Sequence, residues 1–352
     1  MTDSTPNAAS ADFEAAMHEV ETNLEVRRLM LVITNVLTPA CVMAISDCLS
    51  GSDYPPALAW LPPVVLPLSG ALLLGCGFLV AGVLGRCHFG LVLNGTKMRK
   101  VETGRLELQS LNWLGVTTNF VALTALSAAL GAVCLAASCG GRAWAWPAAA
   151  VVAAGLMLWL PVCHWRANRR CRSLDAHWQH GLPPVELRER HARKSLDATA
   201  ADISVVVVMA VALFAGVFNA LTNLGGIPAD LALTPAPAVL KTFGMPVLAA
   251  FLLASQLLSC RILVRLRLAF GTHSRRLAEL RGEVDATAML WRPQERTYLL
   301  YAIVLVLAAA SALLFGYERF GRTLGLVLGG AVLAAGAIWY PFVLRTARRR
   351  RK

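Results

Sequence analysis

The residues best suited to bind a charged ligand form a short element that occurs twice in the chain. Residues 95–100 read Gly-Thr-Lys-Met-Arg-Lys, and residues 271–276 read Gly-Thr-His-Ser-Arg-Arg. A hydroxyl beside guanidinium or ammonium groups can hold a phosphate through charge-assisted hydrogen bonds. The candidate site for a phosphate or a lipid headgroup consists of Thr96, Arg99, Lys100, Thr272, Arg275 and Arg276. The interpretation we favour is simpler, a glycine at a helix end followed by basic residues on the cytoplasmic side.

Two histidines form the second candidate for chemistry. His88 and His164 each follow a cysteine at the end of an apolar run, so they could be a paired ligand set for a metal or a haem. His177 and His180 stand three residues apart and give a weaker metal hypothesis. His88 and His164 have no partner at metal-ligand spacing. The segment of His177 and His180 also holds Cys171 and Asp175, but we favour exposed loop histidines there and predict no metal and no cofactor.

The chain carries no motif of a known catalytic type. We find no nucleophile elbow, phosphate-binding loop or dinucleotide fingerprint, and the nine cysteines include no Cys-x-x-Cys pair. Cys48 and Cys139 approach the outer surface, and a disulfide between them is geometrically allowed. We therefore predict no catalytic residues and expect a protein that is not an enzyme.

The elements that must position these residues are membrane-spanning helices. Of 352 residues, 57% are hydrophobic and only 15% are charged, whereas soluble domains carry about 25% charged residues. Crossing a hydrocarbon core about 30 Å thick takes about 20 apolar residues in a helix. Eight runs qualify: 29–48, 64–85, 114–137, 144–163, 203–223, 242–260, 298–316 and 323–344. The sequence predicts an all-α, polytopic helical membrane protein with about eight transmembrane helices.

Polar residues inside these runs are few and uncharged. Asp47, at the far end of the first run, is the one charged residue in any of them. Proton-coupled and cation-coupled carriers often use intramembrane acids or histidines. The intramembrane polar candidates are Asn35, Asn119, Asn219 and Gln256. They could hydrogen-bond a substrate across the bundle, but we favour hydrogen bonds between neighbouring helices.

The charges between the runs predict the orientation. With the amino terminus in the cytoplasm, 29 of the 33 Lys and Arg residues lie on that side with 17 of the 21 acids. This is the positive-inside pattern, so we place both termini in the cytoplasm, in a bacterial inner membrane. The same pattern accounts for the basic tail 345–352, which we expect to contact anionic lipid. We predict membrane lipids as partners, consider a protein partner at the cytoplasmic face, and predict no nucleic-acid binding.

The order of the runs suggests an internal repeat of four helices. Corresponding runs in the two halves start 174 to 184 residues apart. Trp159-Leu160-Pro161 near the end of the first half matches Trp339-Tyr340-Pro341 near the end of the second. Two units with an even number of spans are expected to be related by a pseudo-two-fold axis along the membrane normal.

The domain division follows from the repeat. We expect a cytoplasmic amphipathic leader at 1–28, a four-helix repeat at 29–163, a cytoplasmic linker at 164–202, a second four-helix repeat at 203–344 and a basic cytoplasmic tail at 345–352. The loops 86–113 and 261–297 are expected to form amphipathic helices that lie at the membrane interface.

Three classes of function fit this organisation. The first is a non-catalytic membrane protein that binds a partner or organises lipid at the cytoplasmic face. The second is a weakly coupled secondary transporter, which the repeat favours. The third is a lipid-modifying membrane enzyme, which only the doubled Gly-Thr element favours. We favour the first, because the spans are featureless and the cytoplasmic face is basic.

Overall fold

All regular structure in the described residues is helical. The computed structural model describes residues 8–50, 61–112, 115–139, 142–177, 181–225, 235–282 and 292–349. The helices are α1 (Ala8–Ser50), α2 (Leu61–Thr103), α3 (Val116–Ser138), α4 (Arg142–Leu174), α5 (Val185–Gly225), α6 (Pro235–Leu280), α7 (Arg292–Phe320) and α8 (Arg322–Arg349), with a short 3₁₀ turn, η2 (Asp175–His177), after α4. Each predicted apolar run falls on one of these helices, so the prediction of an all-α chain is confirmed.

Eight described helices are long and apolar enough to cross a membrane. Their outer surface is apolar as well, with Phe78 on α2 at 52% exposure, Leu158 on α4 at 63% and Ile338 on α8 at 70%. Monomeric soluble proteins rarely expose continuous apolar surface of this extent. These features indicate an integral membrane protein.

Exposed aromatic residues mark two levels on this apolar surface. Trp146 and Trp165 lie 19 residues apart on α4, and Tyr298 and Tyr317 lie 19 residues apart on α7. Nineteen residues of helix span about 28 Å, close to the thickness of about 30 Å of a hydrocarbon core. Because Trp and Tyr prefer the membrane–water interface, the two pairs fit its two boundaries.

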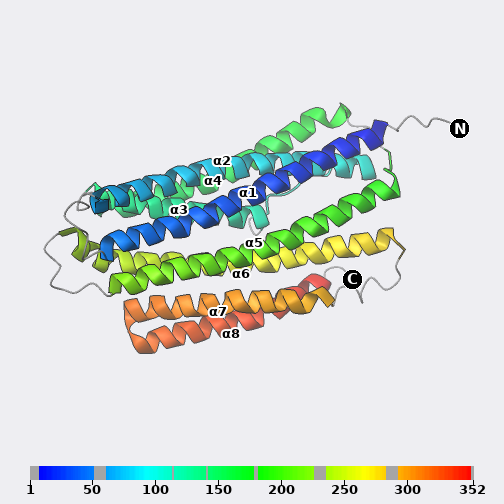
Figure 1. The fold of residues 1–352 in the computed structure, drawn as a ribbon. Coiled ribbons are helices and arrows are strands. Elements are labelled where there is room, and N and C mark those ends of the chain that lie inside the picture. Colours follow the sequence, from blue (N-terminus) through cyan, green and yellow to red (C-terminus); the bar gives the residue numbers. More distant parts are fainter. Residues whose placement is uncertain are drawn as a thin grey trace.

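Four helices are much longer than a membrane is thick. α1, α2, α5 and α6 have 43, 43, 41 and 46 residues, which corresponds to about 60–70 Å each. All four extend past α7 and α8 at the end of the molecule where α1 begins (Figure 1). We call this part the polar bundle, formed by residues 8–28, 86–103, 185–202 and 261–280.

The polar bundle differs from the expected interfacial helices. Residues 86–103 and 261–280 continue α2 and α6 without a break instead of forming separate helices in the membrane surface. Residues 86–103 bury an apolar core together with α1, in which Phe13 and Met17 of α1 pack against Met98 and Val101 of α2. Gly104, with a φ of 70°, then ends α2, and its N–H donates to the Lys100 carbonyl at 2.8 Å.

Ion pairs between helices surround this core. Lys97 lies 3.2 Å from Asp12, Lys194 lies 2.5 Å from Glu21, and Arg281 lies 2.6 Å from Glu189. Exposed pairs contribute at most about 1 kcal/mol each. The apolar core therefore holds the polar bundle together, and the charges keep its outer surface soluble.

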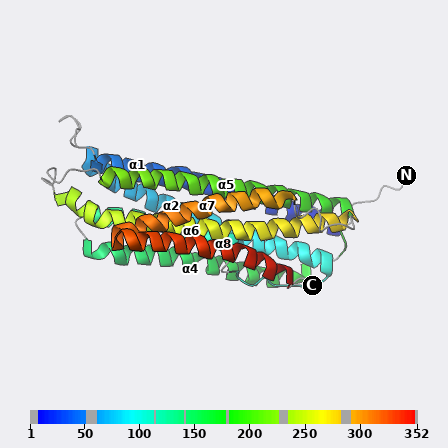
Figure 2. The ribbon, with the colours of Figure 1, turned by 90° about the horizontal axis from the view of Figure 1, so that it is seen from below.

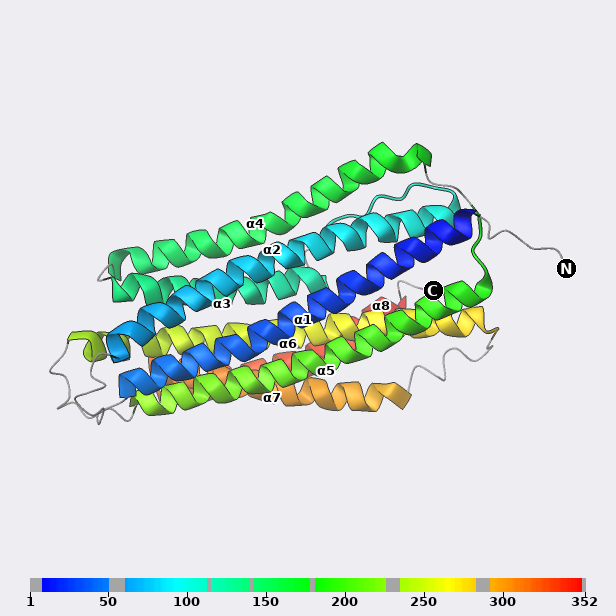
Figure 3. The same cartoon turned by 45° about the horizontal axis from the view of Figure 1, so that its top comes forward.

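The helices run along one common axis (Figure 2). From α1 to α4 and from α5 to α8, each helix packs against the next one in the chain, and α1 packs against α5 and so joins the two halves. α3 is the most buried of the candidate spans and contacts α2, α4 and α6. The halves are not packed alike, because α4 lies against both α2 and α3 (Figure 3), whereas α8 lies almost entirely on α7 (Figure 1).

Candidate functional site

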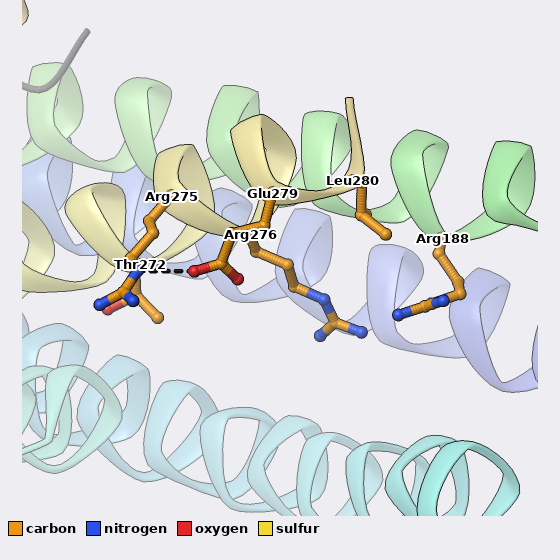
Figure 4. Close-up of a pocket in the computed structure, with 6 residues that line it drawn as sticks. All are labelled: Arg188, Thr272, Arg275, Arg276, Glu279 and Leu280. Atoms are coloured by element: carbon orange, nitrogen blue, oxygen red, sulfur yellow. Dashed lines mark hydrogen bonds and ion pairs between the residues drawn. The ribbon is translucent and has the colours of Figure 1, made fainter. Parts of the chain in front are cut away.

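A cavity of about 580 Å³ lies in the polar bundle between α5 and α6. Arg188 of α5 and the α6 residues Thr272, Arg275, Arg276, Glu279 and Leu280 line it. Figure 4 shows Thr272, Arg275 and Glu279 together on one stretch of α6, with the Arg276 side chain extending along the helix toward Arg188. The second copy of the Gly-Thr element therefore faces this cavity.

Helical spacing explains why these residues meet. Thr272, Arg276 and Glu279 follow one another at intervals of four and three residues, which places them on one helix face. The Thr272 hydroxyl donates to the Leu268 carbonyl of its own helix at 2.9 Å. A phosphate oxygen would have to compete with that carbonyl for the hydroxyl proton, so the arginines are the main donors of the site.

The charges around the cavity do not cancel. Arg276 pairs with Glu102 of α2, and Arg188 Nε lies 3.8 Å from the same carboxylate. Arg275 Nε lies 2.6 Å from Glu279 Oε1. Three guanidinium groups thus share two carboxylates and keep one positive charge, and a positive charge of this kind attracts anions.

The first copy of the element lies elsewhere. Thr96 is fully buried beside Cys171 of α4, and the Lys100 ammonium bonds the carboxylate and the backbone carbonyl of Asp175. Arg99 is exposed on α2. None of these three lines the cavity. The two copies therefore do not form one joint site, because the first copy packs α2 against α4.

Sequence reasoning missed Arg188 and Glu102. Arg188 falls in the segment expected to be a linker, and Glu102 lies outside the repeated element. Glu102 is 174 residues from Arg276, its partner. No spacing or motif marks these residues, since only the packing of α2, α5 and α6 brings them together.

His88 and His164 are in contact, as a ligand pair would require. His88 Nε2 lies 3.1 Å from His164 Nδ1, and His164 Nε2 lies 2.9 Å from the Gln109 carbonyl. Asn168 also donates to that carbonyl, at 2.9 Å. The nitrogen–nitrogen distance is that of a hydrogen bond. Within the described part of the chain, no group of three His, Cys, Asp or Glu side chains could hold a metal ion.

The other candidates from the sequence stand apart from the cavity. His177 lies in η2 and is exposed, and His180 is outside the described residues. Cys139 is exposed and carries a free thiol, while Cys48 lies outside the residues whose side chains are described. Because the Cys139 thiol is free, the structure does not contain the disulfide to Cys48 that the sequence allowed.

Gln256 and Asn119, two of the intramembrane polar residues, both donate to backbone carbonyls. Gln256 is fully buried on α6 and donates to the Ala210 carbonyl of α5 at 2.8 Å, but its Oε1 has no hydrogen-bond partner. Asn119 donates to the Gly115 carbonyl of its own segment at 2.7 Å. Asn219 is half-buried near the end of α5, and the side chain of Asn35 is outside the described residues. The Gln256 bond fits the expected link between neighbouring helices.

Comparison with protein-family models, with curated proteins and with solved structures finds no match to this chain.

Proposed function

We propose that the chain is a non-catalytic integral membrane protein that binds a phosphate-bearing anion in the cavity of the polar bundle. The anion is a soluble phosphate or the headgroup of an anionic lipid at the cytoplasmic face. The observation that carries the proposal is the cavity lined by Arg188, Arg275 and Arg276, with one positive charge left uncompensated. Guanidinium groups match the geometry of phosphate oxygens and bind them with paired hydrogen bonds.

The size and charge of the cavity support this ligand class. Its volume of about 580 Å³ lies within the range of about 300–1,000 Å³ for small-molecule sites. A phosphate group carries more negative charge than the one carboxylate of Glu102 or Glu279. It can therefore replace a carboxylate at two neighbouring guanidiniums.

We place the polar bundle in the cytoplasm of a bacterial cell, with both termini on that side of the inner membrane. The distribution of charge supports this orientation. Trp165 and Tyr298 mark one boundary of the membrane, and the parts of the four long helices beyond that boundary are rich in basic residues. The ligand would then reach the cavity from the cytoplasm.

We further interpret the eight helices as two tandem four-helix units, 29–163 and 203–344, with a leader, a linker and a tail at the predicted boundaries. The helix lengths support this interpretation. The first two helices of each half are long, with 43 and 43 residues in one and 41 and 46 in the other. The last two helices of each half are shorter, with 23 and 33 residues in the first half and 29 and 28 in the second.

Binding of phosphate tests the proposed function directly. The purified protein is titrated with inorganic phosphate in detergent, and separately in nanodiscs of neutral or anionic phospholipid without added phosphate. The triple variant Arg188→Ala, Arg275→Ala, Arg276→Ala is expected to lose binding at least tenfold, about 1.4 kcal/mol or more. Saturable binding of inorganic phosphate identifies a soluble ligand, and retention of anionic lipid alone identifies a headgroup.

A matched control separates the cavity from general electrostatic attraction. The triple variant Arg99→Ala, Arg170→Ala, Arg172→Ala removes the same charge from exposed positions outside the cavity, so its affinity is expected to stay near that of the parent protein. Equal losses in both variants, or no binding of either ligand by the parent protein, would contradict the proposal.

One observation favours the transporter as a second candidate. Gln256 is buried in the membrane-spanning part of α6 with an unsatisfied Oε1, and such groups are candidates for contact with a solute. Solute flux into proteoliposomes that falls in Gln256→Leu, while the thermal stability stays unchanged, would support transport. A loss of stability without any flux would leave Gln256 as a structural link between helices.

A further inference from the structure

Two histidines lie beside the cavity without belonging to its wall. His191 stands three residues after Arg188 on α5, and His273 stands three residues before Arg276 on α6. Each ring is therefore one helical turn from an arginine of the cavity. His191 is packed edge-on against the Phe13 ring at 6.2 Å, and its Nδ1 is buried without a hydrogen-bond partner.

The surroundings of both rings disfavour a positive charge. Burial, together with the charges of Arg276 and His273, lowers the pKa of His191 to about 4. Burial and the charge of Arg276 also lower the pKa of His273. Both imidazoles are outside the apolar runs, in the polar bundle, and they are neutral at neutral pH.

Several acids on the neighbouring helices are already engaged with basic residues. On α1, Asp12 pairs with Lys97, Glu14 with Arg190 and Glu21 with Lys194. On α2, Glu102 pairs with Arg188 and Arg276, and Lys100 pairs with Asp175. Glu189 of α5 pairs with Arg281, and Glu279 of α6 pairs with Arg275. His18 of α1 is exposed at this end as well. An additional negative charge in the cavity would therefore make the electrostatic potential at the His191 and His273 rings considerably more negative.

We propose that anion binding in this cavity is coupled to proton uptake by His191 and His273, an inference that builds on the proposed function. A bound anion offsets the charges of Arg188 and Arg276 and adds negative charge one helical turn from each ring. The imidazolium form becomes favourable, and each ring that responds takes one proton from solvent. By linkage, protons must strengthen anion binding as much as the anion strengthens proton binding.

The affinity for sulfate at several pH values tests this coupling. Sulfate is a tetrahedral oxyanion whose charge does not change between about pH 5 and pH 8, so any pH dependence belongs to the protein. Calorimetric titrations at pH 7.5, 6.5 and 5.5 are expected to show affinity that rises at least about fivefold on acidification, the lower end of usual coupling. The heat should depend on the ionisation enthalpy of the buffer, because protons are taken up on binding.

Glutamine variants assign the protons. His191→Gln, His273→Gln and the double variant keep a polar side chain without a titratable ring, so they should bind sulfate like the parent protein at pH 7.5. The double variant should lose most of the pH dependence. His18→Gln changes an exposed histidine of the same bundle and should leave the dependence intact.

The possible results separate this inference from the proposed function. No sulfate binding at any pH would remove the anion site itself. Binding with equal affinity at all three pH values, or an unchanged pH dependence in the double variant, would overturn the proton coupling and leave the site. If His191→Gln does not fold, His273→Gln and the buffer-dependent heat of the parent protein decide the question.

Discussion

The Arg27 guanidinium of α1 pairs with the Asp202 carboxylate of α5, and both side chains are almost completely buried, at 8% and 2% exposure. Arg28 Nε lies 3.2 Å from the other oxygen of the same carboxylate. The Arg27 guanidinium also lies over the Phe120 ring of α3, 5.6 Å from its centroid. This cluster joins the two halves of the chain where the polar bundle meets the apolar spans.

Asp202→Asn is therefore expected to destabilise the protein by about 3–5 kcal/mol, because it leaves a buried guanidinium without its counter-charge. Thermal unfolding in detergent measures the loss. Asp197→Asn changes an exposed acid on the same helix and should shift the midpoint little. A double change of Arg27→Met and Asp202→Leu should recover much of the stability, since two apolar side chains can replace a buried ion pair. Equal midpoints for Asp202→Asn and the parent protein would show that the pair does not hold the halves together.

Glu102→Gln is expected to strengthen phosphate binding several-fold. The Glu102 carboxylate holds both Arg188 and Arg276, so an incoming anion must compete with it, and the amide is a far weaker competitor. Titration calorimetry at fixed ionic strength measures the change. Glu189→Gln removes a charge whose partner, Arg281, does not line the cavity, and it should have a smaller effect. Weaker binding in Glu102→Gln would show that the carboxylate supports the ligand instead of opposing it.

Gly325→Ala is expected to separate α7 from α8. A Cβ at Gly325 would lie 2.8 Å from the Leu313 carbonyl oxygen and 2.8 Å from the Tyr317 nitrogen, both backbone atoms. Overpacking of this kind typically destabilises by about 1–3 kcal/mol. Gly330, on the same helix, has open space around the position of a Cβ, so Gly330→Ala should be tolerated. The two variants are compared by thermal unfolding in detergent, and similar midpoints for both would contradict the close packing of α7 on α8.

Labelling of Cys139 checks the orientation. This thiol is free and exposed after α3, at the end of the molecule opposite the polar bundle. A membrane-impermeant maleimide should therefore label it in intact bacterial cells. In a variant with Cys139→Ser and Arg99→Cys, the new thiol lies in the polar bundle and should react only after permeabilisation. The reverse order of labelling would place both termini outside.

The two copies of the Gly-Thr element look alike in the sequence but differ in their surroundings in the structure. The Gly-Thr element directed attention to Thr272, Arg275 and Arg276, which do line the cavity, but it treated Thr96, Arg99 and Lys100 as equivalent. They differ because α2 at that level is covered by α4, whereas α6 at the corresponding level borders a cavity. Two matching stretches of sequence can thus have different roles when their neighbours differ.

The eight helices could be read from the amino-acid order, because membrane crossing depends on the local composition of about 20 consecutive residues. The cavity, the His88–His164 contact and the Arg27–Asp202 pair depend on the tertiary structure. The paired residues of the last two stand 76 and 175 positions apart. Their contacts arise only when helices pack, because the free energy of a buried charge depends on which side chains the neighbouring helices bring beside it.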